Sequence, residues 1–261
     1  MSNKAVYPSL NNKVVVITGG GSGIGEAITR SFLKQGAKVS FLDFNENHSK
    51  NLIKELDTDK VHFELCDLRD IEQLKNSIKN VSSKFGPIQI LINNAARDDR
   101  HSLESVTSEY FDERIATNLK HQLFASQAVV NDMESNGGGV IINMGSTSWM
   151  IGQGGMPCYT TAKSAIQGLT RALARDLGPK NIRVNCVVPG GVFTEINQRA
   201  GLFDDDTAKK RLEDMASIHA LGRIGTPMEI AEAIEYLICA EWTTGAVLEV
   251  DGGLGLGLTN A

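Results

Sequence analysis

The chain has 261 residues, of which 41% are hydrophobic, so it can bury a substantial core. A formal net charge of −5 and the lack of any basic block argue against a nucleic-acid surface. No run approaches the ~18 apolar residues of a membrane span, the first residues form no apolar leader, and the four cysteines include no C-x-x-C pair. We therefore expect a cytoplasmic protein with reduced thiols, without a metal site, a membrane or a nucleic-acid partner.

A β-branched run at residues 13–18, KVVVIT, is typical of a strand buried on both faces of a parallel sheet. It leads into GGGSGIG at residues 19–25 and then into an amphipathic helical pattern that ends at Gly36. The loop has G-x-x-x-G-x-G spacing at Gly19, Gly23 and Gly25. A strand, a glycine loop and a helix in this order predict a nucleotide-binding turn, because the glycines let backbone amides approach a pyrophosphate.

A second strand, expected at residues 38–43, ends on Asp43, about 20 residues beyond the loop, where dinucleotide folds place a ribose-binding acid. Its carboxylate could accept hydrogen bonds from the adenosine hydroxyls but would repel a 2′-phosphate. We therefore expect NAD rather than NADP as the cofactor. The alternative is an aspartate that only ends a strand as a turn former.

Further strands are expected at residues 61–66, 88–92, 140–143, 182–188 and 246–251, with helices between them. A capping box that begins at Thr226, with Pro227 at the first helical position, predicts the start of the last helix. This alternation predicts one α/β domain over residues 1–261: a Rossmann-type, doubly wound parallel β-sheet of about seven strands flanked by helices on both faces. The charged segment 192–222 lacks a strand pattern, and we expect either a mobile substrate flap or a solvated helical pair.

The stretch 145–163 places a serine, a tyrosine and a lysine where they can share one proton. Tyr159 and Lys163 are four residues apart, so on a helix both side chains leave the same face. A nearby ammonium favours phenolate over phenol and brings a group that titrates near pH ~10 toward use as a general acid or base. Ser146 follows an apolar strand, and its hydroxyl would point toward the same place. Alone, these residues could also be a helix-surface pair and a turn cap.

Several motifs in the same order make the whole chain similar to the short-chain dehydrogenase/reductase family. They are TGGGSGIG at 18–25, CDL at 66–68, NNAA at 93–96, Asn118, Ser146, YTTAK at 159–163 and VPGGVFT at 188–194. The resemblance implies hydride transfer with a nicotinamide, in which Tyr159 exchanges the proton, Lys163 lowers its pKa and Ser146 holds the reacting oxygen. By the same resemblance Asn118 anchors a relay water, although the residues alone leave a solvated and a partly buried position open.

The family pattern also implies the cofactor contacts. These are expected from Gly19, Ser22, Gly23, Ile24, Gly25, Asp43, Asp67, Leu68, Asn94, Ala95, Ala96, Tyr159, Lys163, Pro189, Gly190, Val192 and Thr194. A homotetramer is likewise carried over from the family, with the apolar face of the helix at 159–177 and the end DGGLGLGL as candidate partner surfaces.

Within this family the chain is more closely similar to bacterial sugar dehydrogenases, which oxidise an aldose at C1 to its lactone. The likeness rests on AVYPSL near the start, DDRH at 98–101, YFDERIATNL at 110–119 and GSTSWMIG at 145–152. The expected substrate contacts are Asp98, Ser146, Ser148, Trp149, Gln153 and Tyr159, around a pentose or 6-deoxyhexose. Met150 and Arg97 depart from that subgroup's pattern.

Two other functions stay open at this point. One is a carbonyl reductase for 3-oxoacyl thioesters or steroids, which would require a more apolar pocket than Ser148, Gln153 and the loop at 98–101 provide. The other is a catalytically silent nucleotide sensor, which should have lost Tyr159 or Lys163. For Trp149 and for the loop at 98–101, a purely structural role is an equal alternative.

Overall fold

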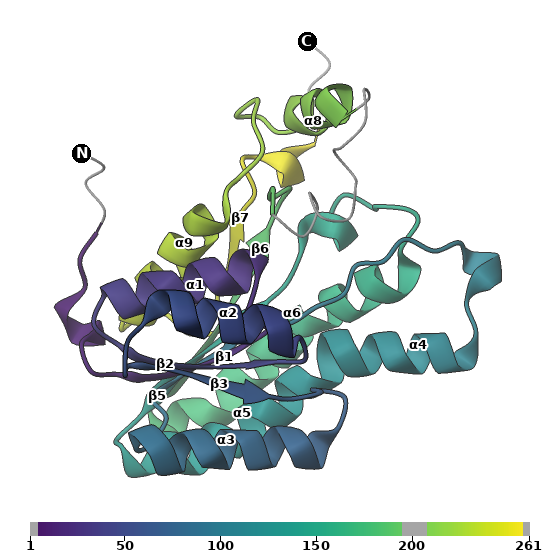
Figure 1. The fold of residues 1–261 in the computed structure, drawn as a ribbon. Coiled ribbons are helices and arrows are strands. Elements are labelled where there is room, and N and C mark those ends of the chain that lie inside the picture. The colour runs from purple at the N-terminus through teal and green to yellow at the C-terminus, as the bar shows by residue number, and fades with distance from the viewer. Residues whose placement is uncertain (1–4, 195–207, 258–261) are drawn as a thin grey trace.

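The computed structural model describes residues 5–194 and 208–257. Seven parallel strands form one sheet in the order β3-β2-β1-β4-β5-β6-β7. Figure 1 shows the fold as a ribbon, with α3 and α5 on the opposite side of the strands from α1 and α2. The strands are β1 Val14–Thr18, β2 Lys38–Asp43, β3 Val61–Leu65, β4 Ile90–Asn93, β5 Gly139–Met144, β6 Ile182–Pro189 and β7 Val247–Val250. The helices are α1 Gly23–Lys34, α2 Glu46–Leu56, α3 Ile71–Phe85, α4 Ser108–Ile115, α5 His121–Ser135, α6 Pro157–Leu177, α8 Ala208–Ser217 and α9 Pro227–Cys239.

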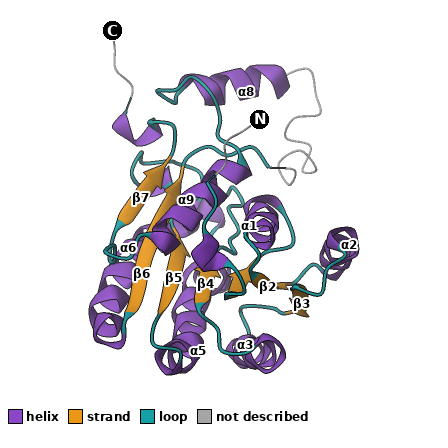
Figure 2. Cartoon of the chain, turned by 90° about the vertical axis from the view of Figure 1, so that its left-hand side faces the viewer, coloured by secondary structure: helices purple, strands orange, loops and turns teal. Residues whose placement is uncertain are grey.

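Helices cover both faces of the sheet: α1, α2 and α9 pack on one side and α3, α5 and α6 on the other, and Figure 2 shows these helices around the strands. In β1, Val15 and Ile17 pack toward α1, α2 and α9, whereas Val14 and Val16 pack toward α3, α5 and α6. Both sets are buried because parallel strands of this kind face a helical layer on each side. Each such side chain contributes about 1.5–3 kcal/mol by leaving water. The doubly wound parallel sheet expected from the sequence is confirmed.

The strand order reverses between β1 and β4, which are hydrogen-bonded neighbours in the middle of the sheet. From β1 the chain continues through β2 and β3 toward one edge of the sheet, and from β4 it continues through β5, β6 and β7 toward the other edge. At such a switch point the connections diverge and leave a crevice at the carboxyl ends of the strands. The glycine loop after β1 and the NNAA segment after β4 both begin there.

Two predicted elements differ from the structure. The strand expected at 88–92 forms as β4, Ile90–Asn93, so its last residue is a buried asparagine. Between β4 and β5, where the sequence predicts a helix, the chain forms α4, then a π-helical turn Ala116–Lys120, then α5. The apolar pattern alone does not predict this turn, because the residues before and after it each keep a helical period.

The last helix, α9, begins where the sequence predicts it. Thr226 accepts from the Glu229 amide, and Glu229 in turn accepts from the Thr226 amide, so the capping box at the start of α9 is confirmed. Of the segment 192–222, residues 195–207 lie outside the described residues, and α8 occupies part of the remainder. The flap stays a prediction.

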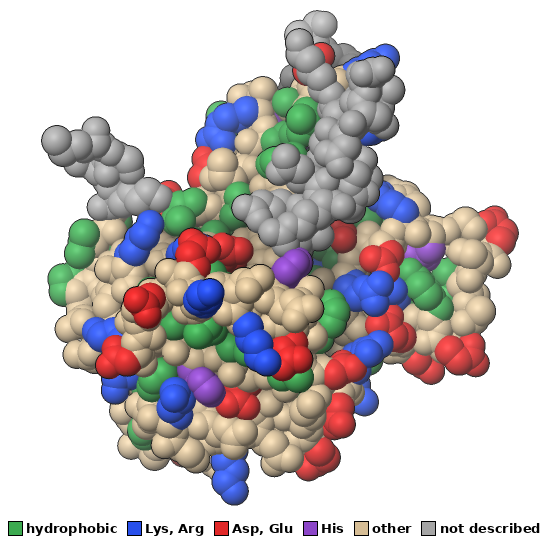
Figure 3. Space-filling view, in the orientation of Figure 1, with side chains coloured by type: hydrophobic (Ala, Val, Ile, Leu, Met, Phe, Trp, Pro, Cys, Tyr) green, Lys and Arg blue, Asp and Glu red, His purple; other side chains and the backbone are tan. Residues whose placement is uncertain are grey.

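The surface features agree with a chain of mixed charge. On the face shown in Figure 3, acidic and basic side chains are interspersed. Among the described residues, no helix combines the length and apolar character needed to cross a bilayer. On α6, Ile166 and Leu177 are buried within the chain, whereas Leu169 and Leu173 are partly buried, and the tetramer stays a prediction. Leu256, in the glycine-rich end, is exposed.

Candidate active site

The glycine loop between β1 and α1 has little room for side chains. Gly19 has a positive φ of 66°, and a Cβ there would lie 2.9 Å from the Ala95 Cα atom. A Cβ on Gly25 would overlap the Gly19 carbonyl oxygen. Ser22 is the N-cap of α1 but its side chain makes no capping hydrogen bond. The first-turn amides, which include those of Gly23 and Ile24, therefore stay free of a side-chain cap and are available to an anion.

Asp43, at the end of β2, supports this loop directly. Its Oδ2 accepts from the Gly21 amide at 3.0 Å and its Oδ1 accepts from the Asn45 amide at 2.9 Å. The side chain is buried, and no described lysine or arginine forms an ion pair with it. Asp43 therefore does more than end a strand at a turn. It ties the end of β2 to the glycine loop and keeps lone pairs that ribose hydroxyls could use.

Asn94, after β4, closes the loop from the other side. Its Nδ2 donates to the carbonyls of Thr18 at 3.1 Å and Gly19 at 3.0 Å, while the Thr18 hydroxyl accepts from the amides of Asn94 and Ala95. Ala96 follows as an exposed residue. The NNAA segment thus shapes the cofactor crevice through hydrogen bonds that its sequence did not reveal.

At the outer end of the crevice, Asp67 is engaged by a neighbour. Arg69 donates to its two carboxylate oxygens, with Nε at 2.9 Å from Oδ1 and Nη2 at 2.6 Å from Oδ2, and this pairing lowers the pKa of Asp67. The Asp67 side chain is still 42% exposed, so an adenine amino group could reach it. Leu68 is partly buried against the α3 side of the core.

Ser146, Tyr159 and Lys163 converge beyond the end of β5. Tyr159 and Lys163 lie in the first two turns of α6, and the Lys163 Nζ is 5.5 Å from the centre of the Tyr159 ring. Lys163 is only 2% exposed, and its Nζ donates to the Met144 carbonyl at 2.8 Å. The Ser146 side chain hydrogen-bonds to Tyr159 and accepts from the Ser148 amide at 3.2 Å. The three residues that the spacing suggested are therefore in one cluster.

The electrostatics of this cluster fix its resting protonation. Burial raises the pKa of Tyr159 to about 12, against the hydrogen bond from Ser146, and the Asp98 charge raises it as well. Burial lowers the pKa of Lys163 to about 8, with Cys186 and Asp98 acting in the opposite direction. At neutral pH the phenol is protonated and most of the lysine is charged. A further positive charge beside the phenol is needed to bring Tyr159 into use as a base.

Asn118 sits in the π-helical turn and is fully buried, which rules out the solvated alternative. Its Oδ1 accepts from the Arg97 amide at 2.9 Å, and its Nδ2 donates to the carbonyls of Arg97 and Arg114 at 3.1 and 3.0 Å. Its own carbonyl accepts from the Gln122 side chain at 3.2 Å. The asparagine thus fixes the loop after β4, which carries Asp98, to the helix below it. Wide helical turns often occur at functional sites.

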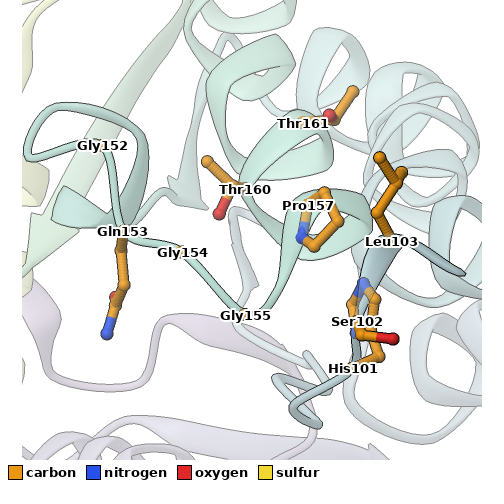
Figure 4. Close-up of a pocket in the computed structure, with 10 residues that line it drawn as sticks. All are labelled: His101, Ser102, Leu103, Gly152, Gln153, Gly154, Gly155, Pro157, Thr160 and Thr161. Atoms are coloured by element: carbon orange, nitrogen blue, oxygen red, sulfur yellow. The ribbon is translucent and has the colours of Figure 1, made fainter. Parts of the chain in front are cut away.

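Of the residues expected to contact the substrate, some have their polar atoms enclosed and others are accessible from solvent. Ser148 is buried and its hydroxyl has no hydrogen-bond partner, and the Trp149 indole nitrogen is likewise enclosed without one. Gln153 instead lines an open pocket of about 650 Å³, which Figure 4 shows. The pocket lies between the Gly152–Gly155 loop, the start of α6 and residues 101–103. Asp98 is exposed, and its charge reaches Tyr159 and Lys163.

After β6 the backbone is held by a histidine that the sequence did not single out. The Gly191 amide donates to Nε2 of the buried His219 at 3.1 Å, so its Nδ1 carries the proton and donates to the Met215 carbonyl at 2.7 Å. Before it, Pro189 ends the strand and the Gly190 amide donates to the Val250 carbonyl at 3.1 Å. After it, Val192 pairs with Gly225 and Thr194 ends this part of the described chain. A lone histidine gives no sequence signal for such a role.

Comparison with known proteins decides the family. A model described as short chain dehydrogenase matches residues 13–204. The chain belongs to the short-chain dehydrogenase family. It is therefore an oxidoreductase, and membership implies a nicotinamide cofactor. The family and fold expected from the motifs are confirmed.

The relatives of this short-chain dehydrogenase include sugar dehydrogenases. It is 49% identical to D-xylose 1-dehydrogenase of Caulobacter vibrioides over 199 residues, which cover 76% of this chain and 79% of the relative. It is 41% identical to a probable galactose dehydrogenase of Rhizobium meliloti over 206 residues, covering 78% and 80% of the two chains. Among solved structures it is similar to the ligand-free aldohexose dehydrogenase of Thermoplasma acidophilum, with a TM-score of 0.88, 30% identity and coverage of 98% of each chain.

Proposed function

We propose that this short-chain dehydrogenase oxidises the C1 hydroxyl of a free aldose, a pentose or 6-deoxyhexose, to the lactone with NAD as the acceptor. The observation that carries the proposal is the contact of Ser146, Tyr159 and Lys163 at the carboxyl end of β5, beside the exposed carboxylate of Asp98. The sugar is supported by the names of the relatives at 49% and 41% identity.

The residues present fit a dinucleotide. The uncapped amides at the start of α1 suit the pyrophosphate, and a side chain on Gly25 would fill the space that the loop needs. Asp43 suits ribose hydroxyls, and its charge disfavours a 2′-phosphate. Neither Phe44, which follows it, nor Ser22 in the loop supplies a positive charge to offset that repulsion. These features support NAD over NADP.

The three clustered side chains can then divide the chemistry. When bound, the nicotinamide supplies the hydride-accepting carbon and a positive charge. Tyr159, as phenolate, takes the proton of the C1 hydroxyl while Ser146 holds the same oxygen by a hydrogen bond. With oxidised nicotinamide as the two-electron acceptor, the reaction would balance as aldose and oxidised cofactor giving lactone, reduced cofactor and one proton. Lys163 stabilises the phenolate and holds the nicotinamide ribose.

The released proton needs a path out of a site where Lys163 is almost wholly buried. A lysine with a pKa of about 8 exchanges a proton more readily near neutral pH than an ordinary lysine. We extend the proposal to Asn118, whose carbonyl would hold a relay water while also accepting from Gln122. In this scheme the proton passes from Tyr159 through Lys163 toward that water.

The test is NADH formation with a panel of free pentoses, hexoses and 6-deoxyhexoses, with the lactone trapped as its hydroxamate. Oxidation of at least one aldose with formation of hydroxamate supports the proposal. Inactivity on every aldose, together with brisk NADH-dependent reduction of a 3-oxoacyl thioester, would instead assign the chain to a carbonyl reductase.

A further inference from the structure

Two neighbouring aspartates after β4 have opposite environments. Asp99 is bound by two arginines: its Oδ2 is 2.7 Å from Nη2 of Arg97 and 2.7 Å from Nη2 of Arg114. Asp98 is exposed and has no hydrogen-bond or ion-pair partner within residues 5–194 and 208–257. The Asp99 carboxylate therefore has a structural role, whereas the Asp98 carboxylate can accept hydrogen bonds from a ligand.

The arginine that anchors Asp99 is buried at the end of α4. Arg114, at the end of α4, is 5% exposed, and its guanidinium lies over the Tyr110 ring at 4.7 Å from the ring centre. Its Nε is 3.2 Å from a carboxylate oxygen of Glu113. A buried guanidinium with a paired carboxylate and an aromatic ring beneath it has little freedom to move. The Asp99 carboxylate is therefore fixed in place relative to α4.

The other end of the loop is tied to the helix that carries Tyr159. The His101 amide donates to the Gly155 carbonyl at 2.8 Å, and the Arg100 Nη1 donates to the Gly154 carbonyl at 3.0 Å. The Cys158 amide donates to Nε2 of His101 at 3.3 Å, so Nδ1 carries the proton and donates to the Asp99 carbonyl at 2.9 Å, with the Tyr110 hydroxyl 3.0 Å away. Figure 4 shows His101 beside Gly155 and the first turn of α6.

These ties hold the segment that carries Asp98 beside the start of α6, the helix that also carries Tyr159 and Lys163. The segment from residue 97 to residue 101 is pinned to α4 by Asp99 and to the start of α6 by His101, and Asp98 lies between the two pins. The Asp98 charge acts on both Tyr159 and Lys163, which places the carboxylate within electrostatic range of the proton-transferring pair. An exposed acid at the rim of a site is suited to bind hydroxyl groups of a substrate.

We propose that Asp98 binds two neighbouring ring hydroxyls of the sugar and that Asp99, held by Arg97 and Arg114, positions it. An ionised carboxylate only accepts hydrogen bonds, and its two oxygens match a pair of adjacent hydroxyl donors. A 3-oxoacyl thioester offers no such pair at its reacting end. This inference rests on the proposed function, and it assigns substrate selection to a carboxylate and its support.

The first test is Asp98→Asn, with Asp112→Asn as the matched control, since Asp112 is exposed on α4 and undergoes the same change of charge. We expect Asp98→Asn to lower kcat/KM for the preferred aldose by about 10- to 100-fold, chiefly through KM, because a charged hydrogen-bond partner is lost. NADH affinity should not change. The preference of the wild type for the parent sugar over an analogue lacking one of the two hydroxyls should collapse in Asp98→Asn but not in Asp112→Asn.

The pH profile supplies a second readout, which a merely structural role would not move. The Asp98 charge raises the pKa of Tyr159, so its removal should lower that pKa and move the acid limb of kcat/KM to lower pH. The other groups near this pair stay in place: Ser146 against Tyr159, and His121 and Cys186 near Lys163. Burial keeps His121 neutral, with a pKa of about 3, and raises the pKa of the Cys186 thiol to about 11, so neither titrates in this range.

The anchor is tested by Asp99→Asn and Arg114→Lys, with melting temperature as the check on folding. Both should raise the KM for the aldose by about 5-fold or more and leave kcat within about 3-fold, because the free carboxylate is displaced while the reacting groups are not. If the wild type oxidises no aldose, the proposed function is wrong. If it does, but Asp98→Asn keeps its aldose KM within about 2-fold and its pH profile unmoved, the function stands and this inference is wrong.

Discussion

Lys163→Met should make the protein more stable and inactive at the same time. Burial lowers the pKa of Lys163 from its usual 10.5 to about 8, so holding the charged amine in the folded chain costs about 3 kcal/mol near neutral pH, at 1.36 kcal/mol per unit of pKa. The substitution also removes the hydrogen bond from the Lys163 Nζ to the Met144 carbonyl, which contributes about 1 kcal/mol to stability. The net gain of about 2 kcal/mol corresponds to a rise in melting temperature of about 4–8 °C.

The gain should depend on pH in a defined direction. The unfolded lysine titrates near 10.5 and the folded one near 8, so between these values the unfolded chain binds more protons and wild-type stability rises with pH. The advantage of Lys163→Met should therefore be complete below pH 8 and shrink as the pH rises above it. The value of kcat should fall by at least about 100-fold, because Tyr159 loses its ammonium.

The assay is thermal unfolding of both proteins from pH 6 to 9.5, beside NADH formation with the preferred aldose. The control is Lys54→Met, which removes an exposed lysine from α2 and should show no pH-dependent gain. A Lys163→Met protein that is less stable than wild type at every pH would refute the reasoning, since it would mean that the buried charge costs nothing.

The remaining predictions concern the tyrosine, the cofactor and the assembly. Tyr159→Phe should lower kcat by more than about 100-fold while NADH binding, followed by fluorescence, stays the same, and retention of more than a few per cent of kcat would contradict the phenolate role. NAD should exceed NADP in kcat/KM by about 100-fold, because Asp43 repels a 2′-phosphate, and comparable values would contradict this. A homotetramer should give about four times the 28.2 kDa chain mass in light scattering at micromolar concentration, supported by the exposed Phe111 and Leu123 on α4 and α5, whereas a monomer mass would exclude it.

The sheet was predictable because its strands are local and strongly patterned. Five consecutive buried residues in β1 and the alternation with helices report burial on both faces directly in the sequence. The ends of the strands were harder to predict. Asn93 is polar and is therefore typical of a loop, but it belongs to β4, where its Nδ2 donates to the Asn143 side chain on the neighbouring strand at 2.9 Å. A buried polar pair of this kind depends on two distant segments meeting, which no local pattern reports.

The site was predictable only where its residues are close in the chain. Tyr159 and Lys163 follow from a four-residue helical spacing, but the pairing of Asp99 with Arg114 joins residues 15 positions apart across a loop with no regular period. The same limit explains Asp98 and Asp99, which look equivalent in the sequence and differ in the structure. The orientation of a loop residue is set by the partners that the fold brings to it.

The double use of Asp43 constrains any attempt to redesign the cofactor. Its carboxylate accepts from two backbone amides, those of Gly21 and Asn45, in addition to the role toward the ribose hydroxyls that we propose for it. An alanine introduced to admit a 2′-phosphate would leave both amides without an acceptor and would loosen the loop to which we assign the pyrophosphate. Such an enzyme would bind both dinucleotides poorly. A switch of preference therefore needs a replacement side chain that still accepts from these amides, with an added cation supplied from position 44 or 22.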